Sequence, residues 1–292
     1  MPFTHSLLAL AVVFVWGTNF VVIRWGLDAM PPFFFAALRF GLSALPFALF
    51  MPRPRVPWHT LAAFGMLLGM GQFGLLYFAI GGFISPGLAS LVVQAQVFFT
   101  IGIAMFLMRE RLQRYQVLGL LAGLAGLLVI AGHLDASVTA TGLSLVLAAA
   151  FFWACANMVA KSAGKVNMLH FTVWASVFAA PPLFLLSWLT EGWGAIHHGL
   201  VTATPLVWSS VVWQAAGNTL FGFGVWNWLL SRHPAAAVTP MALLVPVFGM
   251  SASAMSLGEA LPGWKLLACA LVLGGLAIIV LWPRWRSRLA SS

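Results

Sequence analysis

The stretch FVWGTNFVVIRWGL, residues 14–27, decides the fold class. It belongs to a long apolar run, and it places a few polar residues inside that run. That run extends from about residue 5 to residue 26, and a membrane-spanning helix needs roughly 20 mostly apolar residues. Lipid disfavours amides and cations, so such groups at membrane depth usually face a bundle interior or a cavity. We therefore expect a first membrane helix in which Trp16 and Asn19 face an internal path, while Arg24 marks the helix end.

The composition of the whole chain supports the same class. Of the 292 residues, 62% are hydrophobic and 7% are charged, and the mean hydropathy is +1.01. A soluble domain has about 25% charged residues, so this chain cannot cover a water-facing surface. The net charge is +9, but the basic residues are spread over short loops, which indicates topology signals and not a nucleic-acid-binding face. Cys155 and Cys269 have no spacing that predicts a metal site or a disulfide framework.

Ten segments are predicted to cross the membrane, which makes the chain an all-α polytopic membrane protein. They lie at about 5–26, 32–51, 58–80, 86–108, 114–132, 141–161, 168–190, 205–231, 235–257 and 263–282. Prolines, glycines and charged residues separate them, as in MPRPRVP and KSAGKVN.

The basic residues predict the orientation of these helices. With the N-terminus inside, eleven of the 14 Lys and Arg residues lie in inner loops or in the C-terminal tail. The exceptions are Arg24 and Lys265, toward outer helix ends, and Arg39, inside the second span. Because cytoplasmic loops carry an excess of Lys and Arg, both termini are predicted to be cytoplasmic.

Two internal echoes divide the chain into halves. WGTNFVVIR at 16–24 matches WACANMVAK at 153–161, and LMRERLQRYQVLGLLAGLAGLLVI at 107–130 matches SLGEALPGWKLLACALVLGGLAII at 256–279. The two offsets differ, and a loop with the sequence TEGWGAIHHGLVTATP accounts for the extra residues. Any two apolar helices look alike, but matched aromatic, basic and glutamate positions in the same order favour a true repeat. We expect halves at 1–135 and 136–292 with five helices each, and an odd number inverts the second half, as in many transporters.

These features carry a resemblance to a known family. Ten spans, two five-helix halves, an early WG…N helix and a GE-x-L element at Gly258–Leu261 resemble the EamA-type branch of the drug/metabolite transporter superfamily. Within that branch, the chain is similar to the amino-acid exporters of the YddG kind. The resemblance implies a bacterial-type inner (plasma) membrane protein that exports amino acids, and the direction of transport rests on the resemblance alone.

Polar and aromatic side chains inside the predicted spans are the candidate substrate-binding residues. They are Trp16, Asn19, Arg39, Gln72, Tyr77, Gln94, Gln96, Trp153, Asn157, Gln214 and Asn218. Each amide has the alternative of bonding only to a neighbouring helix. Gln94 and Gln96 are two residues apart, so we expect at most one of them to line the path. Arg39 is either tied to backbone carbonyls or answers a carboxylate.

The missing groups narrow the function further. Neither Asp nor Glu falls in the middle of a predicted span, so we expect facilitated transport and not proton coupling. The chain has no H-E-x-x-H, G-x-S-x-G or Walker A sequence, so we expect no enzyme, no catalytic or metal site and no cofactor. Glu110 and Glu259 each precede the next predicted helix by a few residues, so they are interpreted as acids that favour its N-terminus.

We therefore expect a carrier that exports small metabolites, most of all neutral or aromatic amino acids, by alternating access. The alternatives are an exporter of another metabolite or drug (purine-like, phosphorylated sugar or lipophilic cation) and a channel-like facilitator. The expected partners are a small-molecule substrate and the lipid bilayer, without nucleic acid. The sequence leaves two roles for Gly119 and Gly123, helix packing within the chain or contact with a second copy in a homodimer.

Overall fold

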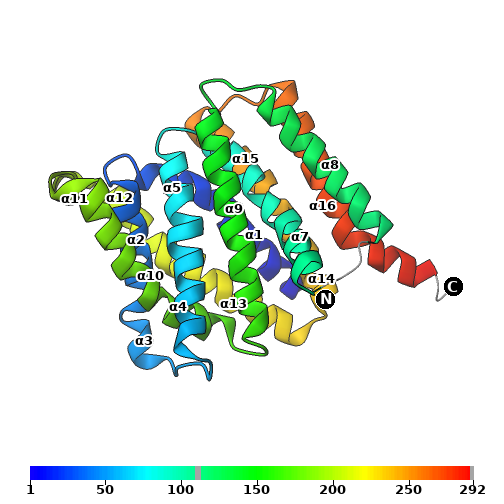
Figure 1. The fold of residues 1–292 in the computed structure, drawn as a ribbon, viewed down its shortest axis with the longest axis horizontal. Helices are drawn as coiled ribbons and strands as arrows, with labels where there is room; N and C mark the ends of the chain where they lie inside the picture. The colour runs from blue at the N-terminus through cyan, green and yellow to red at the C-terminus, as the bar shows by residue number, and fades with distance from the viewer. Residues whose placement is uncertain (109–112, 290–292) are drawn as a thin grey trace.

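The structure is a computed structural model that describes residues 1–108 and 113–289, and these residues are built from helices (Figure 1). The first half of the chain forms α1 (Phe3–Gly26), α2 (Pro32–Ala44), α3 (Phe47–Phe50), α4 (Trp58–Met66), η1 (Leu67–Gly74), α5 (Leu75–Ile80), α6 (Pro86–Val92), η2 (Val93–Ala95), α7 (Gln96–Met108) and α8 (Arg114–Ala131). The second half forms α9 (Ala140–Ser162), α10 (Met168–Thr190), α11 (Gly192–Thr202), α12 (Pro205–Val212), η3 (Trp213–Phe221), α13 (Gly222–Arg232), α14 (Ala235–Val238), η4 (Thr239–Leu244), α15 (Val245–Leu257) and α16 (Gly263–Leu289).

Within the described residues, nine helices are long and apolar enough to cross a membrane. Their ends lie within a few residues of nine of the predicted segments, so the polytopic α-helical class is confirmed. The remaining predicted segment, 205–231, is also helical, as α12, η3 and α13 in succession. It carries the amides Gln214, Asn218 and Asn227, which lower its hydropathy below that of the other nine.

Helices far apart in sequence lie side by side. α1 packs on α15, α2 packs on α10, and α8 and α16 form a pair at one edge of the bundle (Figure 1). The α8–α16 pair is close because glycines face each other: a Cβ on Gly119 would collide with the Gly275 carbonyl oxygen and the Ile279 side chain. Gly123 faces the Phe98 ring. Both glycines that sequence assigned to packing or to a second copy therefore face helices of the same chain.

The stretch predicted as a loop at 190–205 is helical from Gly192 to Thr202, so that prediction is wrong. It contains no proline before Pro205 to break a helix, and one side of it is buried at Ile196 and Gly199. Gly199 lies against the backbone of the α1–α2 connection at Ala29 and Met30. Packing against that connection supplies a burial that this short, glycine-containing sequence does not by itself indicate.

Glu191, the residue just before α11, caps the N-terminus of α2. Glu191 accepts hydrogen bonds from the backbone N–H groups of Phe33 (2.8 Å) and Phe34 (3.2 Å), in the first turn of α2. The Ser187 hydroxyl also donates to this carboxylate. A carboxylate at a helix N-terminus satisfies unpaired N–H groups and interacts favourably with the helix dipole. Glu191 therefore fixes α2, which carries Arg39, against the end of α10.

Candidate functional site

A chain of polar contacts links three helices through side chains predicted for the site. The Arg39 guanidinium on α2 donates from Nη1 to the Tyr77 hydroxyl on α5 (3.0 Å). That hydroxyl donates in turn to Oε1 of Gln214 on η3 (2.8 Å). All three side chains are buried. The chain therefore brings together predicted site residues that lie as far as 175 positions apart in sequence.

Aromatic rings surround the Arg39 guanidinium. Its central carbon lies 3.6 Å from the centre of the Phe73 ring and 5.2 Å from that of Phe40. Such cation–π contacts offset part of the cost of removing a cation from water. From the sequence, the expected partners of Arg39 are backbone carbonyls or a carboxylate. The structure gives it a phenol and a ring face, and among the described residues no carboxylate lies within ion-pair distance of it.

Two of the predicted glutamines lie in π-helical segments. Gln72 belongs to η1 and Gln214 to η3, the π-helical segments of the described chain. In η3 the Thr219 hydroxyl donates to the Gln214 carbonyl oxygen, five residues earlier (3.0 Å). π turns are rare and are frequently found at functional sites. Each of these segments interrupts a helix that passes through the polar region of the bundle.

Several buried polar atoms lack a hydrogen-bond partner within the described part of the chain. They are Asn19 Oδ1, Arg39 Nε, Ser43 Oγ, Gln72 Oε1, Thr172 Oγ1 and Gln214 Nε2. A buried polar group left unpaired costs about 1–3 kcal/mol, and more if it is charged. Four of these six atoms belong to predicted site residues. The structure therefore leaves part of the hydrogen-bonding capacity of these predicted residues unused.

The other predicted residues form separate contacts. The Trp16 indole N–H donates to the Asn218 backbone carbonyl (3.2 Å), and Asn157 Nδ2 donates to Gln96 Oε1 (2.9 Å). The pair Asn157–Gln96 is the helix-to-helix contact that was the alternative for each amide. Gln94 is buried in η2, just before α7 begins, and Trp153 is half-buried against the core.

A second buried charge cluster lies at the ends of the helices. Glu259, in the turn between α15 and α16, accepts from Lys265 Nζ (2.9 Å), the Ser253 hydroxyl (2.6 Å) and the Gly87 backbone N–H (3.0 Å). The Ser85 hydroxyl donates to it as well. Gly87 is in the first turn of α6, so Glu259 serves the N-terminus of α6 and not, as the sequence predicted, that of the helix that follows it. Glu110 lies outside the described residues.

The pKa of Glu259 reflects this environment. Burial raises the pKa, but the hydrogen bonds from Ser253, Ser85 and Lys265 and the charge of Lys265 outweigh it and hold the pKa below its ordinary value. The carboxylate is therefore ionised at neutral pH. Because both its oxygens are engaged, the cluster is a completed structural ion pair.

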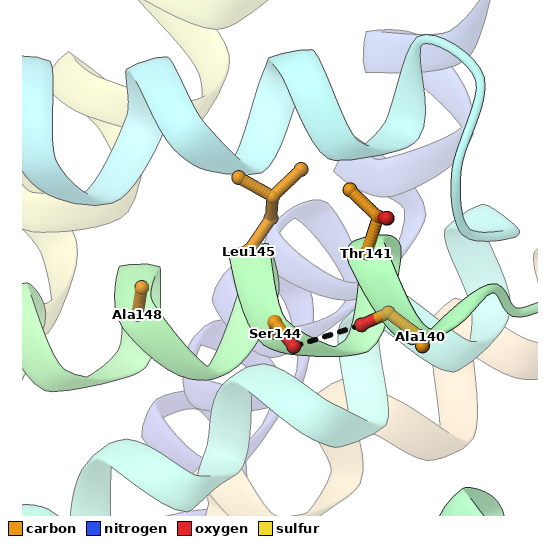
Figure 2. Close-up of a pocket in the computed structure, with 5 residues that line it drawn as sticks. All are labelled: Ala140, Thr141, Ser144, Leu145 and Ala148. Carbon is orange, nitrogen blue, oxygen red and sulfur yellow. Dashed lines mark hydrogen bonds between the residues drawn. The ribbon is translucent and has the colours of Figure 1, made fainter.

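Two hollows are found in the described part of the chain. One, of about 550 Å³, is lined by residues of α9 alone, and its hydroxyl Ser144 is already bonded to the Ala140 carbonyl oxygen (Figure 2). The other, of about 740 Å³, is an apolar groove between α2, α10 and α12 that includes Phe34, Phe184 and Trp208. Neither is lined by a residue predicted for the site.

Sequence reasoning missed Phe73 as a site residue. It precedes Tyr77 by four positions, so the two share a helix face, and their rings are 5.9 Å apart. The sequence did hold one signal for Phe73: it lies four residues before a tyrosine in a glycine-rich predicted helix. It was hidden because phenylalanine is common throughout the apolar segments.

Comparison with known proteins places the chain among membrane transporters. The model of the EamA-like transporter family matches residues 4–132 and again residues 140–281. A "Probable amino-acid metabolite efflux pump" of Salmonella typhimurium is 41% identical over 96% of this chain and 95% of its own length. A protein of the same name from Escherichia coli K12 is 40% identical, with 96% of each chain covered.

More distant relatives extend the comparison. A "Probable terminal-alkyne amino-acid exporter" of Streptantibioticus cattleyicolor is 26% identical over all of this chain and 99% of its own length. One solved crystal structure has a TM-score of 0.64 at 22% identity, and it covers 96% of this chain and 98% of that one. At that identity the likeness concerns the fold alone.

Proposed function

The chain belongs to the EamA-like transporter family, and on this premise we propose that it exports amino acids or their close metabolites from the cytoplasm. The family membership confirms the predicted resemblance, and it confirms a transporter in place of an enzyme. The substrate class is drawn from the names of the two relatives at 40% and 41% identity. Neutral and aromatic amino acids are the first candidates, because aromatic side chains are frequent around the buried polar region.

The architecture that we propose has ten spans in two inverted halves, at 1–135 and 136–292, with both termini in the cytoplasm. The two stretches matched by one family model, 4–132 and 140–281, support this division. The π-helical segments support it too, since η1 follows the helix α4 and η3 follows α12 at comparable distances from the helix start. The helical run Pro205–Arg232, which carries three amides, is then the tenth span.

The binding site that we propose lies where α2 and α5 meet η3. The observation that carries it is the buried Arg39–Tyr77–Gln214 chain, whose ends have unpartnered N–H groups. The Arg39–Tyr77–Gln214 hydrogen bonds join the two proposed halves. If the halves separate first on one side of the membrane and then on the other, these side chains are exposed to one compartment at a time, which is alternating access. Gln72, Asn19 and the tryptophans Trp16 and Trp153 would line the neighbouring path.

We propose facilitated transport because no carboxylate accompanies Arg39 among the described residues. Purified protein in liposomes should therefore move labelled amino acids down their gradient without an imposed pH gradient. Counterflow, in which unlabelled substrate on one side accelerates labelled substrate from the other, should be present and would distinguish a carrier from a channel.

The same liposomes test the site. Gln72→Ala and Trp153→Ala should each slow amino-acid flux, while Trp188→Ala, which changes an exposed tryptophan on α10, should not. Normal flux through both Gln72→Ala and Trp153→Ala would remove these residues from the site. Absence of flux for every amino acid in the native protein would contradict the proposed function itself.

A further inference from the structure

Arg39 is a buried cation whose counter-charge is missing from the described residues. The four described acids are engaged elsewhere: Asp28 pairs with Arg24, Asp135 accepts from Ser137, Glu191 caps α2, and Glu259 pairs with Lys265. Charged side chains are almost never fully buried unless they are paired. The single positive charge of the guanidinium is therefore not neutralised by any described residue, and one anion would neutralise it.

The direction of the hydrogen bonds shows which kind of group would complete the site. The Tyr77 hydroxyl uses its proton on Gln214 Oε1 and its lone pair on Arg39. This order leaves N–H groups free at both ends, at Arg39 Nε and at Gln214 Nε2. Donors without acceptors, beside an unbalanced positive charge, match a ligand that only accepts and carries a negative charge.

We propose that Arg39 and Gln214 receive the carboxylate of the transported molecule, so that a free carboxylate is the feature that the carrier requires. The inference rests on the proposed function and deepens it by assigning the two N–H donors. Tyr77 acts as a positioning residue that holds both donors in one arrangement. The Phe73 ring covers one face of the guanidinium, so the anion meets it at its N–H edge.

The charge of the site favours a monoanion over a phosphorylated metabolite. A phosphate monoester carries about two negative charges at pH 7. Among the described residues, the buried Lys and Arg side chains are Arg39 and Lys265, and Lys265 is already neutralised by Glu259. One unbalanced cation therefore matches one carboxylate.

Access to this site requires movement of η3 relative to α2 and α5, because all three side chains are buried in the structure. The π-helical segment η3 carries Gln214 itself, so a shift of this segment moves one of the two donors. When η3 moves away from α2 and α5, the hydrogen bonds of Tyr77 with Arg39 and Gln214 break. A bound carboxylate would accept hydrogen bonds from Arg39 and Gln214 in their place, and it would stay between these two donors when the helices close again.

The test compares each L-amino acid with its own carboxamide, which has the same side chain and ammonium group but no negative charge. Counterflow is measured in liposomes with the native protein and the twenty standard amino acids. We expect the acids to be transported at least about 100-fold faster than their amides, because a buried donor left unpaired rejects an analogue strongly. Amides moved within threefold of the acids would overturn the inference while the proposed function stands. If no acid moves, the proposed function is wrong and the inference falls with it.

Variants at the two donors provide a second readout. Gln214→Met keeps the volume and should raise the KM for the acid about 10–100-fold, the effect of losing one hydrogen bond to a charged group. Arg39→Met should abolish the preference for acid over amide. Gln116→Leu, on α8 outside the site, is the matched control and should change neither. If Arg39→Met does not fold, Gln214→Met alone decides, and an unchanged KM and acid preference would overturn the inference.

Discussion

Two buried cations stand out among the described residues, and their surroundings are opposite. Lys265 is 2% exposed, its partner carboxylate Glu259 is 7% exposed, and that carboxylate also receives two hydroxyls and a backbone N–H. Arg39 is 1% exposed and has a phenol, two rings and an unpartnered nitrogen. The first arrangement is complete without a ligand, whereas the second is not. Burial of a charge therefore does not by itself identify a binding site, and the unsatisfied hydrogen bonds are the distinguishing observation.

The largest expected effect tests the complete cluster. Glu259→Ala leaves Lys265 buried without a counter-charge, and breaking a buried pair from one side costs about 3–5 kcal/mol. We expect a large fall in the melting temperature of the detergent-solubilised protein. The double variant Glu259→Ala/Lys265→Met should recover much of this loss. If Glu259→Ala has the same melting temperature as the native protein, Lys265 does not depend on Glu259, and the proposed difference between Lys265 and Arg39 is wrong.

Acid should remove part of the same stabilisation. The pKa of Glu259 lies below its ordinary value of 4.5, so its contribution to stability is complete above that value and is lost as pH falls through the lowered pKa. The melting temperature of the native protein should therefore approach that of Glu259→Gln as the pH is taken from 7 to about 3. A gap between the two proteins that stays constant over this range would contradict the assignment of the ion pair.

A smaller effect tests the incomplete cluster. Tyr77→Phe leaves Gln214 Oε1 and Arg39 Nη1 without their present partner, which should cost about 1–3 kcal/mol in the free energy of unfolding. It should also weaken the preference for substrates with a carboxylate, because the two donors are no longer held together. Tyr115→Phe, on α8, is the control for loss of a hydroxyl. Equal melting temperatures and equal preferences for Tyr77→Phe and Tyr115→Phe would contradict the role given to Tyr77.

Much of the fold could be predicted from the sequence because lipid imposes a simple rule. A run of about 20 apolar residues closed by proline, glycine or charge has one favourable form, a helix, and the observed ends follow that rule. The helix α11 was missed because it is short and its buried side depends on contact with Met30, far away in the chain. The π-helical segments were missed because no residue pattern distinguishes a π turn from an α turn.

The candidate site could be predicted only as a set of residue types. Depth in the second span identified Arg39 as a charge that needs a partner, and hydropathy identified Gln214 and Tyr77 as polar groups inside helices. Their mutual contact could not be predicted, because it joins α5 to η3 across 137 positions of sequence. The partners of Glu259 were hidden for the same reason, since Gly87 lies 172 positions before it.

Those two carboxylate caps impose an order on biosynthesis. The N-terminus of α2 receives its cap from a residue 158 positions later, and the N-terminus of α6 from one 172 positions later. At about 5–20 residues per second, the ribosome delivers each cap roughly 8 to 35 s after the helix that needs it. During that interval the first-turn N–H groups of α2 and α6 lack these carboxylate caps and need other acceptors, such as water. Both helix N-termini are therefore capped only once the chain has been synthesised through Glu259.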